Sequence, residues 1–328
     1  MASQSFVRPI FENPFLNIEE LAGDTIVRKP EPLTQANSDP NGTSLVVSKD
    51  VDLDINKKTW LRIYVPQRTI TNHNDDEKLP VIFYYHGGGF VFFHANSFAW
   101  DLFCQGLAGN LGAMVISLEF RLAPENRLPA AYDDAMDGLY WIKSTQDEWV
   151  RKYSDLSNVY LFGSSCGGNI AYHAGLRVAA GAYKELEPVK IKGLILHQPY
   201  FSGKNRTESE EKLKDDQLLP LHAIDKMFDL SLPKGTLDHD HEYSNPFLNG
   251  GSKHLDDVIA QGWKILVTGV SGDPLVDNAR NFANFMEEKG IKTFKLFGDG
   301  YHAIEGFEPS KAAALIGATK DFICATTN

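Results

Sequence analysis

The chain has 328 residues, of which 43% are hydrophobic and 23% charged, as is typical of a globular protein with a sizeable core. Its formal net charge is −11, and such an acidic surface repels phosphate backbones and anionic lipid heads. Nucleic acid and membrane surfaces are therefore poor candidate partners, and no apolar run is long enough to cross a bilayer.

The cysteines and the first residues bear on the compartment. Cys104, Cys166 and Cys324 are far apart and odd in number, and no Cys-x-x-Cys pair occurs, so we expect free thiols rather than a zinc site. The first residues lack the basic and apolar regions of a secretion signal. The sequence therefore favours a cytoplasmic protein.

The N-terminal part of the chain gives weak structural signals. Residues 1–45 mix isolated apolar positions with a polar stretch, and no structured core is evident there. Residues 71–78 are polar and charged, which is typical of a solvated loop before a strand.

From residue 79 onward, short apolar runs alternate with helical spacing. Strands are expected at 81–85, 113–118, 159–162, 191–196, 264–267 and, more weakly, 293–297. Helices are expected at 129–143, 167–182 and 278–289. Continuous apolar runs of this length are typical of strands buried on both faces of a parallel sheet. The alternation predicts an α/β domain with a central, mostly parallel sheet flanked by helices.

An insertion interrupts this alternation. Residues 202–255 are rich in charge and contain two short apolar helical patches, at 218–221 and 224–230. Long insertions between strands are usually functional or disordered, so this one is a candidate cap over an active site.

The segment 163–167 reads Gly-Ser-Ser-Cys-Gly and matches the pattern Gly-x-Ser-x-Gly. In this pattern the central serine sits on a strained turn from a strand to a helix, and the flanking glycines avoid a clash across that turn. A predicted strand precedes the motif and a predicted helix follows it. We therefore predict Ser165 as a nucleophile, since Ser164 does not hold the central position.

The segment 86–90 reads His-Gly-Gly-Gly-Phe and follows the first buried strand. Consecutive glycines lose much backbone entropy when they become ordered. A site in which backbone N–H groups must approach a substrate closely is a reason for glycines at these positions. We assign the backbone N–H groups of Gly88, Gly89 and Cys166 to an oxyanion hole. A cysteine nucleophile is the competing interpretation, but Cys166 follows the central position. His86 is expected to orient this loop rather than to act as the base.

An acid and a base are expected after the nucleophile, in that order. Asp273 follows the strand at 264–267, and His302 follows the strand at 293–297. Both lie past the carboxyl ends of their strands, where such sheets hold their chemistry. We predict that His302 takes the proton from Ser165 and that Asp273 orients the imidazole. Asp277 is the rival acid.

Residues 238–241, which read Asp-His-Asp-His, look like a metal cluster at first sight. Neighbouring residues in a loop rarely converge on one ion, so no metal site is expected.

These segments together resemble a known family. The matching motifs lie at 86–90, 119–125, 128–134, 163–171, 272–275 and 300–303, in order. The chain is similar to the plant carboxylesterases of the hormone-sensitive-lipase group of α/β-hydrolases, from about residue 45 to the C-terminus. The resemblance implies one α/β-hydrolase domain over 1–328, a helical cap built from about 1–45 and 202–255, and hydrolysis of short carboxylic esters such as acetates. No cofactor is implied.

Two positions depart from the family pattern. The family usually has Asp before the nucleophile and Ala or Ser after it, where this chain has Ser164 and Cys166. Cys166 adds bulk near the acyl site and Ser164 removes a charge, which bears on substrate choice. Ser164, Phe90 and Phe93 are candidate pocket residues, although an aromatic cluster after the glycines is as easily part of the core.

Other activities occur in the same group. Some members carry out elimination, cyclisation, or decarboxylation after ester cleavage on a plant metabolite, and gibberellin receptors of the group have lost the catalytic histidine. His302 is present here, which argues against a binding-only role. We expect a small-molecule ester as the partner, and a monomer or weak homodimer.

Overall fold

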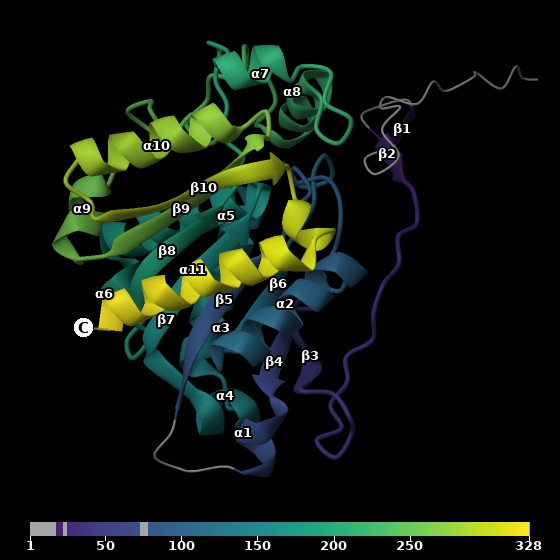
Figure 1. The fold of residues 1–328 in the computed structure, drawn as a ribbon, viewed down its shortest axis with the longest axis vertical. Helices are drawn as coiled ribbons and strands as arrows, with labels where there is room; N and C mark the ends of the chain where they lie inside the picture. Colours follow the sequence, from purple (N-terminus) through teal and green to yellow (C-terminus); the bar gives the residue numbers. More distant parts are fainter. Residues whose placement is uncertain (1–17, 22–24, 73–77, 328) are drawn as a thin grey trace, which may run out of the picture.

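The computed structural model describes residues 18–21, 25–72 and 78–327 (Figure 1). Its main sheet has eight strands in the order β10-β9-β8-β7-β5-β6-β4-β3. The strands are β3 (Val46–Asp54), β4 (Thr59–Pro66), β5 (Leu79–Tyr85), β6 (Met114–Glu119), β7 (Ser154–Ser164), β8 (Ile191–His197), β9 (Lys264–Gly272) and β10 (Thr293–Tyr301). β4 runs antiparallel to β3 and β6, and the remaining pairs are parallel.

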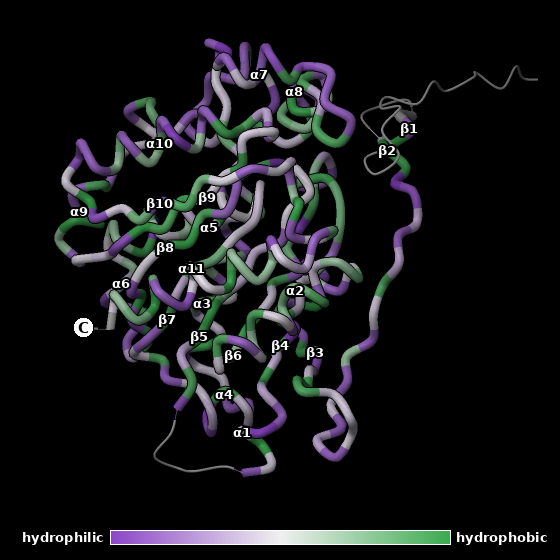
Figure 2. The backbone as a smooth tube through the Cα atoms, viewed as in Figure 1, coloured by the Kyte–Doolittle hydropathy of each residue, from purple (hydrophilic) through white to green (hydrophobic). Residues whose placement is uncertain are grey.

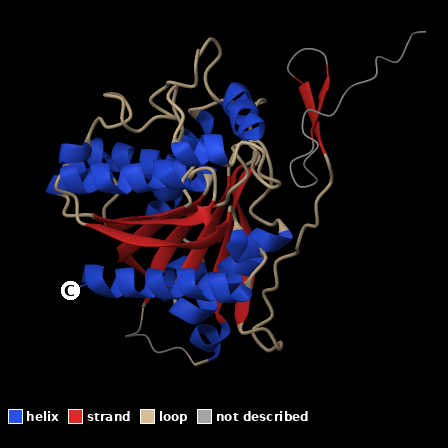
Figure 3. Cartoon of the chain, turned by 45° about the horizontal axis from the view of Figure 1, so that its top comes forward, coloured by secondary structure: helices blue, strands red, loops and turns tan. Residues whose placement is uncertain are grey.

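The helices cover both faces of this sheet, which forms the middle layer (Figure 3). They are α1 (Gln67–Thr71), α2 (Phe98–Leu111), α3 (Ala130–Ser144), α4 (Glu148–Tyr153), α5 (Cys166–Arg177), α6 (Tyr183–Glu185), α7 (Glu208–Lys212), α8 (Leu221–Ser231), α9 (Leu255–Ala260), α10 (Val276–Glu288) and α11 (Pro309–Thr327). Within the described ranges, none of them combines the length and apolarity needed to cross a bilayer.

The α/β fold is confirmed, and all six expected strands are present as β5 to β10. The sequence does not predict β3 and β4. Charged residues interrupt β3, in which no residue after Ser48 is buried, and Arg62 interrupts the apolar run of β4. The helix expected over 167–182 ends as an α-helix at Arg177 and continues as a short π-helical turn, Val178–Ala182. Gly181 in that turn has φ 152°, which breaks the regular helix.

Successive side chains along each strand point to opposite faces of the sheet, which produces one hydrophobic core on each face. In β5, Ile82 and Tyr84 pack on the face covered by α2 and α11, whereas Phe83 and Tyr85 pack on the face covered by α3, α5 and α10. The central strands are correspondingly hydrophobic along the chain, and the outer loops are hydrophilic (Figure 2). Each large side chain buried in this way contributes about 2 kcal/mol through removal of apolar surface from water.

The insertion 202–255 is folded, and its helices α7 and α8 lie at one end of the sheet (Figure 1). The buried face of α8 includes Ile224, Met227 and Phe228. Its backbone is tied to the main domain, since Ser231 O accepts the N–H of Leu128 at 2.8 Å. The apolar patch noted at 224–230 is therefore a packed helix face.

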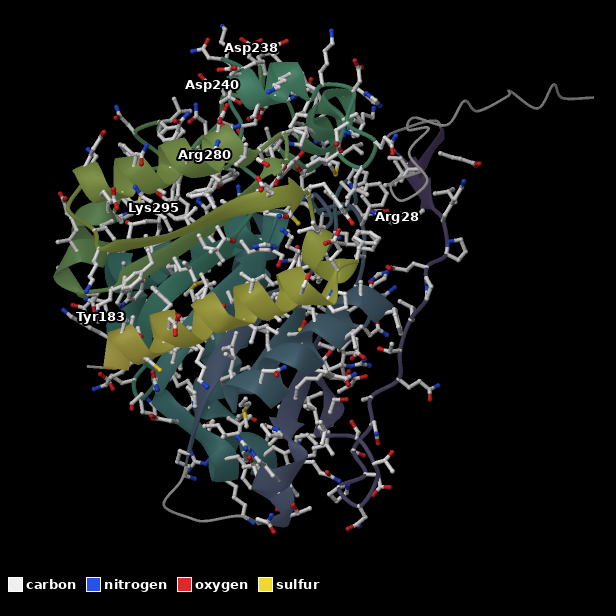
Figure 4. All side chains as sticks on the ribbon, viewed as in Figure 1. Arg28, Tyr183, Asp238, Asp240, Arg280 and Lys295 are labelled. Atoms are coloured by element: carbon white, nitrogen blue, oxygen red, sulfur yellow. The ribbon has the colours of Figure 1, made fainter. Side chains whose placement is uncertain are left out.

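The N-terminal segment contributes a small antiparallel hairpin, β1 (Ile18–Leu21) and β2 (Thr25–Arg28). Arg28 joins it to the main domain by donating to Val91 O and Ala123 O, both at 2.5 Å, and by an ion pair with Glu125 (Figure 4). Residues 1–17, which belong to the expected cap, and residues 73–77 of the expected loop lie outside the described residues.

Candidate active site

The turn between β7 and α5 has the geometry that Gly-x-Ser-x-Gly requires. Ser165 has φ 54° and ψ −119°, a backbone conformation that non-glycine residues rarely adopt. A Cβ atom at Gly163 would overlap the carbonyl of Gly167, and one at Gly167 would overlap the carbonyl of Tyr85. Only glycine fits at both flanking positions, so the sequence pattern follows from the closeness of the backbone here.

The structure brings Ser165, His302 and Asp273 together from the ends of three strands, β7, β10 and β9. His302 Nε2 lies 3.0 Å from Ser165 Oγ, and His302 Nδ1 lies 2.8 Å from Asp273 Oδ2. Asp273 is fully buried, and its other carboxylate oxygen accepts the N–H of Leu275 at 2.9 Å. Both distances are within hydrogen-bond range.

Electrostatics favour the charged form of His302 despite its burial. Burial alone would lower the pKa of this imidazole, but the adjoining Asp273 carboxylate, with Glu305 and Asp216 further away, raises the pKa above its ordinary value. An imidazolium that forms by taking a proton from Ser165 would thus be stabilised where it arises.

Asp277, the rival acid, lies elsewhere. Its Oδ2 accepts the N–H of Ser209 at 2.9 Å, at the first turn of α7, and its Oδ1 lies 3.4 Å from Arg280. Asp277 therefore joins α10 to the insertion, and Asp273 is the carboxylate beside His302.

The glycine loop lies beside the serine turn. Gly88 has φ 126°, and a Cβ atom there would overlap the carbonyl of Phe92. The Gly88 carbonyl accepts the N–H groups of Val91 and Phe92 at 3.1 and 2.9 Å, which closes the loop into a tight turn. The N–H groups of Gly88 and Gly89 belong to this turn.

His86 lies inside this loop. Its ring stacks on Phe120 with 4.3 Å between the ring centroids, and its Nδ1 lies 2.8 Å from Gly87 O. Complete burial lowers the pKa of His86 to about 4, so the ring is neutral near neutral pH.

The Cys166 side chain is fully buried against the glycine loop. Its Sγ lies 3.6 Å from His86 O and beside the backbone N–H groups of Gly89 and Phe90. Burial raises the pKa of the thiol to about 12, and the thiolate is the reactive form of cysteine. The thiol therefore acts as packing between the loop and the serine turn, which argues against a cysteine nucleophile.

The predicted pocket residues lie around the same turn, in different roles. Ser164 is buried, and its hydroxyl accepts a hydrogen bond from Tyr84 at 3.0 Å. Phe90 is buried edge-on against Tyr200, with 6.1 Å between the ring centroids. Phe93 is half-buried, and its ring lies next to Gly88.

Next to the glycine loop, sequence reasoning missed Met227. The Sδ of Met227, on α8, lies so close to Gly89 that a Cβ atom on this glycine would overlap it. The helical spacing of the patch at 224–230 indicated a buried face, but no sequence signal could show which loop it would contact.

The side chains of the Asp-His-Asp-His segment, residues 238–241, contact different partners. Asp238 lies 3.0 Å from Lys204, His239 lies 2.8 Å from Asp229, and Asp240 accepts from Asn245 at 2.7 Å. Asp238 and Asp240 lie at the outer surface of the insertion (Figure 4). Across the described residues, no group of three or more acidic, histidine or cysteine side chains is placed to hold a metal ion.

Comparison with known proteins identifies the family. A family profile described as alpha/beta hydrolase fold matches residues 82–305. Carboxylesterase 20 of Arabidopsis thaliana is 42% identical over 313 residues, which cover 94% of this chain and 95% of that protein. The chain belongs to the plant carboxylesterases of the α/β-hydrolase fold.

Further relatives agree with this assignment. The 3-O-acetylpapaveroxine carboxylesterase CXE2 of Papaver somniferum is 43% identical over 284 residues, 84% of this chain and 90% of that protein. An esterase of Pyrobaculum calidifontis has the same fold, with a TM-score of 0.68, 24% identity, and coverage of 86% of this chain and 85% of that one. This carboxylesterase hydrolyses carboxylic esters, as expected from its motifs.

Proposed function

We propose that this carboxylesterase hydrolyses short-chain esters, acetates foremost, through a serine mechanism. In this proposal Ser165 is the nucleophile, His302 the general base and Asp273 the acid that orients the base. The observation that supports it most directly is the contact of His302 with both partners, 3.0 Å to Ser165 Oγ and 2.8 Å to Asp273 Oδ2.

The reaction runs in two halves. Ser165 Oγ attacks the ester carbonyl carbon while its proton passes to His302 Nε2. The C–O bond to the alcohol then breaks, and His302 returns the proton to the departing alcohol, which leaves an acyl group on Ser165. A water molecule gives a proton to His302, attacks this acyl group and releases the carboxylic acid, and the proton goes back to Ser165.

The developing charge on the carbonyl oxygen needs donors in place before the reaction. The N–H groups of Gly88, Gly89 and Cys166 are the proposed donors, and the tight turn at Gly88 supports this assignment. Loss of one such donor costs about 3 kcal/mol of transition-state stabilisation.

Two observations support a short acyl group. Met227 packs against Gly89, so the space on that side of the proposed oxyanion hole is limited. A relative at 43% identity is named for an acetylated compound, 3-O-acetylpapaveroxine. That name also favours a second candidate function, cleavage of an ester on a larger plant metabolite, with a small acyl group and a bulky alcohol.

We further infer that one α/β-hydrolase domain carries a cap built from about residues 1–45 and 202–255. The packed helices of the insertion and the Arg28 contacts support this division. We also infer that the protein acts in the cytoplasm, which the free thiols of Cys104 and Cys166 support. We infer that it is a monomer or weak homodimer, which the net charge of −11 supports.

The test is turnover of p-nitrophenyl acetate with and without diethyl p-nitrophenyl phosphate. We expect hydrolysis that the phosphate ester abolishes, with a covalent adduct on Ser165 in peptide mass spectra. Ser165→Ala should lower kcat by at least ~10³-fold and should not be labelled. Ester turnover that survives in Ser165→Ala, or an adduct on Cys166, would contradict the serine mechanism, and a chain without turnover or label would act as a receptor-like binding protein.

A further inference from the structure

A second buried pair of a histidine and an acid lies next to the proposed triad. His197 Nε2 lies 2.9 Å from Glu305 Oε2, and the two side chains are only 6% and 2% exposed. His197 Nδ1 lies 2.6 Å from Thr268 Oγ1 on the neighbouring strand β9. The hydrolytic steps proposed above use neither His197 nor Glu305, and burying a carboxylate beside an imidazole costs free energy unless the two groups have good partners.

The main chain of the same histidine holds the nucleophile. His197 ends β8, which lies between the serine strand β7 and the acid strand β9. Its carbonyl accepts the N–H of Ser165 at 2.9 Å. One residue thus contacts the backbone of the nucleophile on one side and, through its ring, the loop of the base on the other.

The next residue makes a second tie to the loop of the base. Gln198 Oε1 accepts the N–H of Ala303, the neighbour of His302, at 2.7 Å. Gln198 and Ala303 have φ values of 45° and 59°, in the left-handed region that non-glycine residues adopt at a cost of about 1–3 kcal/mol each. The surrounding contacts must therefore hold both residues in these conformations.

These ties matter because His302 follows the edge strand of the sheet. β10 pairs with β9 alone, and none of its residues is fully buried. The loop that follows it includes the 3-10 turn Ile304–Gly306, which packs against α2 and α11. His197, at the end of β8 two strands further into the sheet, and Gln198 just after it contact this loop from the side, at Glu305 and at Ala303.

We propose that His197, Gln198 and Glu305 form a positioning unit that fixes His302 relative to Ser165. The inference rests on the proposed roles of Ser165 and His302. These three residues act through His302 and do not touch the ester.

The charge environment agrees with this arrangement. Burial alone would raise the pKa of Glu305, but His197 beside it, with His302 further off, holds the pKa below its ordinary value, so the carboxylate is ionised. Three carboxylates raise the pKa of His302: Asp273 after β9, which contacts the ring, Glu305 in its own loop and Asp216 of the insertion. Tyr84 also faces Glu305.

The central experiment uses Glu305→Gln, which keeps the shape and removes the charge. We expect kcat for p-nitrophenyl acetate to fall about 10²-fold with KM unchanged, because a small displacement of the base is enough for such a loss. The pKa of His302 should fall with the lost charge, so the acid limb of the kcat/KM profile should move to lower pH. Glu305→Asp keeps the charge at a shorter reach and should lower kcat without moving that limb.

Asp101→Asn is the matched control, since Asp101 forms a buried ion pair with Arg62 at 3.0 Å in a different part of the fold. It should lower Tm and leave kcat and the acid limb unchanged. If Glu305→Gln has wild-type kcat and a wild-type acid limb with only a lower Tm, the pair is merely structural and the proposal fails.

A third variant covers the case in which Glu305→Gln does not fold. Gln198→Met removes the side-chain amide, and with it the acceptor for Ala303 N–H. This variant should lower kcat without moving the acid limb, and wild-type kcat would overturn the positioning unit. Failure of the proposed function is distinguishable, because it would appear in the wild-type protein as the absence of a phosphate adduct on Ser165.

Discussion

At the scale of single residues, burial makes each group in the site depend on its immediate partners. Ser165, His302 and Asp273 have exposed fractions of 8%, 7% and 0%, so water screens little of their interaction. The raised pKa of His302 comes from neighbouring carboxylates that overcome the effect of burial. The protonation state of the base, and with it the pH dependence of hydrolysis, therefore reports on these contacts directly.

Asp273→Asn tests the contact between Asp273 and His302. His302 must be neutral to take a proton, so wild-type activity should fall as pH drops through the raised pKa of His302. Without the carboxylate this pKa falls, and the acid limb of kcat/KM should move to lower pH. In addition, kcat should drop by ~10⁴-fold, because the wrong tautomer of His302 is stabilised. Initial rates with p-nitrophenyl acetate between about pH 5 and 9 measure both effects.

Asp277→Asn separates the two candidate acids. Asp277 accepts from Ser209 N–H and does not contact His302, so kcat should stay close to the wild-type value, with a loss of about 1 kcal/mol in the free energy of unfolding. Steady-state kinetics and urea unfolding on the same preparation check this. A greater loss of kcat in Asp277→Asn than in Asp273→Asn would reverse the assignment of the acid.

At the scale of elements, the insertion contributes one side of the site through α8. Tyr200, just before the insertion, contacts α8 in two ways. Its hydroxyl donates to Ile224 O at 2.6 Å, and its ring stacks on Phe228 with 4.2 Å between the ring centroids. Met227 lies on the same helix and packs against Gly89. Acyl-chain preference should therefore depend on this helix as much as on the glycine loop.

Met227→Ala opens space next to the proposed oxyanion hole. We expect the ratio of kcat/KM for p-nitrophenyl butyrate to that for the acetate to rise about 10-fold, which is the discrimination that one or two methylene groups provide. Met286→Ala, in the buried face of α10, removes the same side chain elsewhere and should leave the ratio unchanged. An unchanged ratio in Met227→Ala would mean that another surface limits the acyl chain.

At the scale of the whole molecule, the sheet separates two hydrophobic cores, and only one of them includes the helix that follows Ser165. The face covered by α3, α5 and α10 includes the helix that follows Ser165, and the face covered by α2 and α11 supports the sheet from the other side. Stability depends on both cores, because the same strands contribute alternate side chains to each.

Phe322→Ala tests whether the core under α2 and α11 affects stability without affecting kcat. Phe322, on α11, is 1% exposed and packs edge-on against Tyr160 and Phe294. Its truncation should lower the free energy of unfolding by about 3–5 kcal/mol through the lost contacts and the cavity. The folded fraction should retain wild-type kcat, which urea unfolding and active-site titration with diethyl p-nitrophenyl phosphate can measure. A specific loss of kcat would show that the two faces are coupled.

The amino-acid sequence determined the features that depend on local physics. The strands β5 to β10 were predictable because their apolar runs are continuous, and the turn at Ser165 because Gly163 and Gly167 leave no room for a side chain. The order of Ser165, Asp273 and His302 along the chain is the one expected after a Gly-x-Ser-x-Gly turn, and each was expected where its strand ends. The interrupted strand β3, with its charged, solvent-facing positions, lacked this signal.

Only the tertiary structure decided which distant groups meet. The contact of Met227 with Gly89 and the pairing of His197 with Glu305 join segments that are far apart in the chain. Nothing in the local composition of those segments specifies the partner, because each is equally suited to other apolar or charged neighbours. The packing of α8 over the glycine loop and the register of β8 between β7 and β9 make these contacts specific.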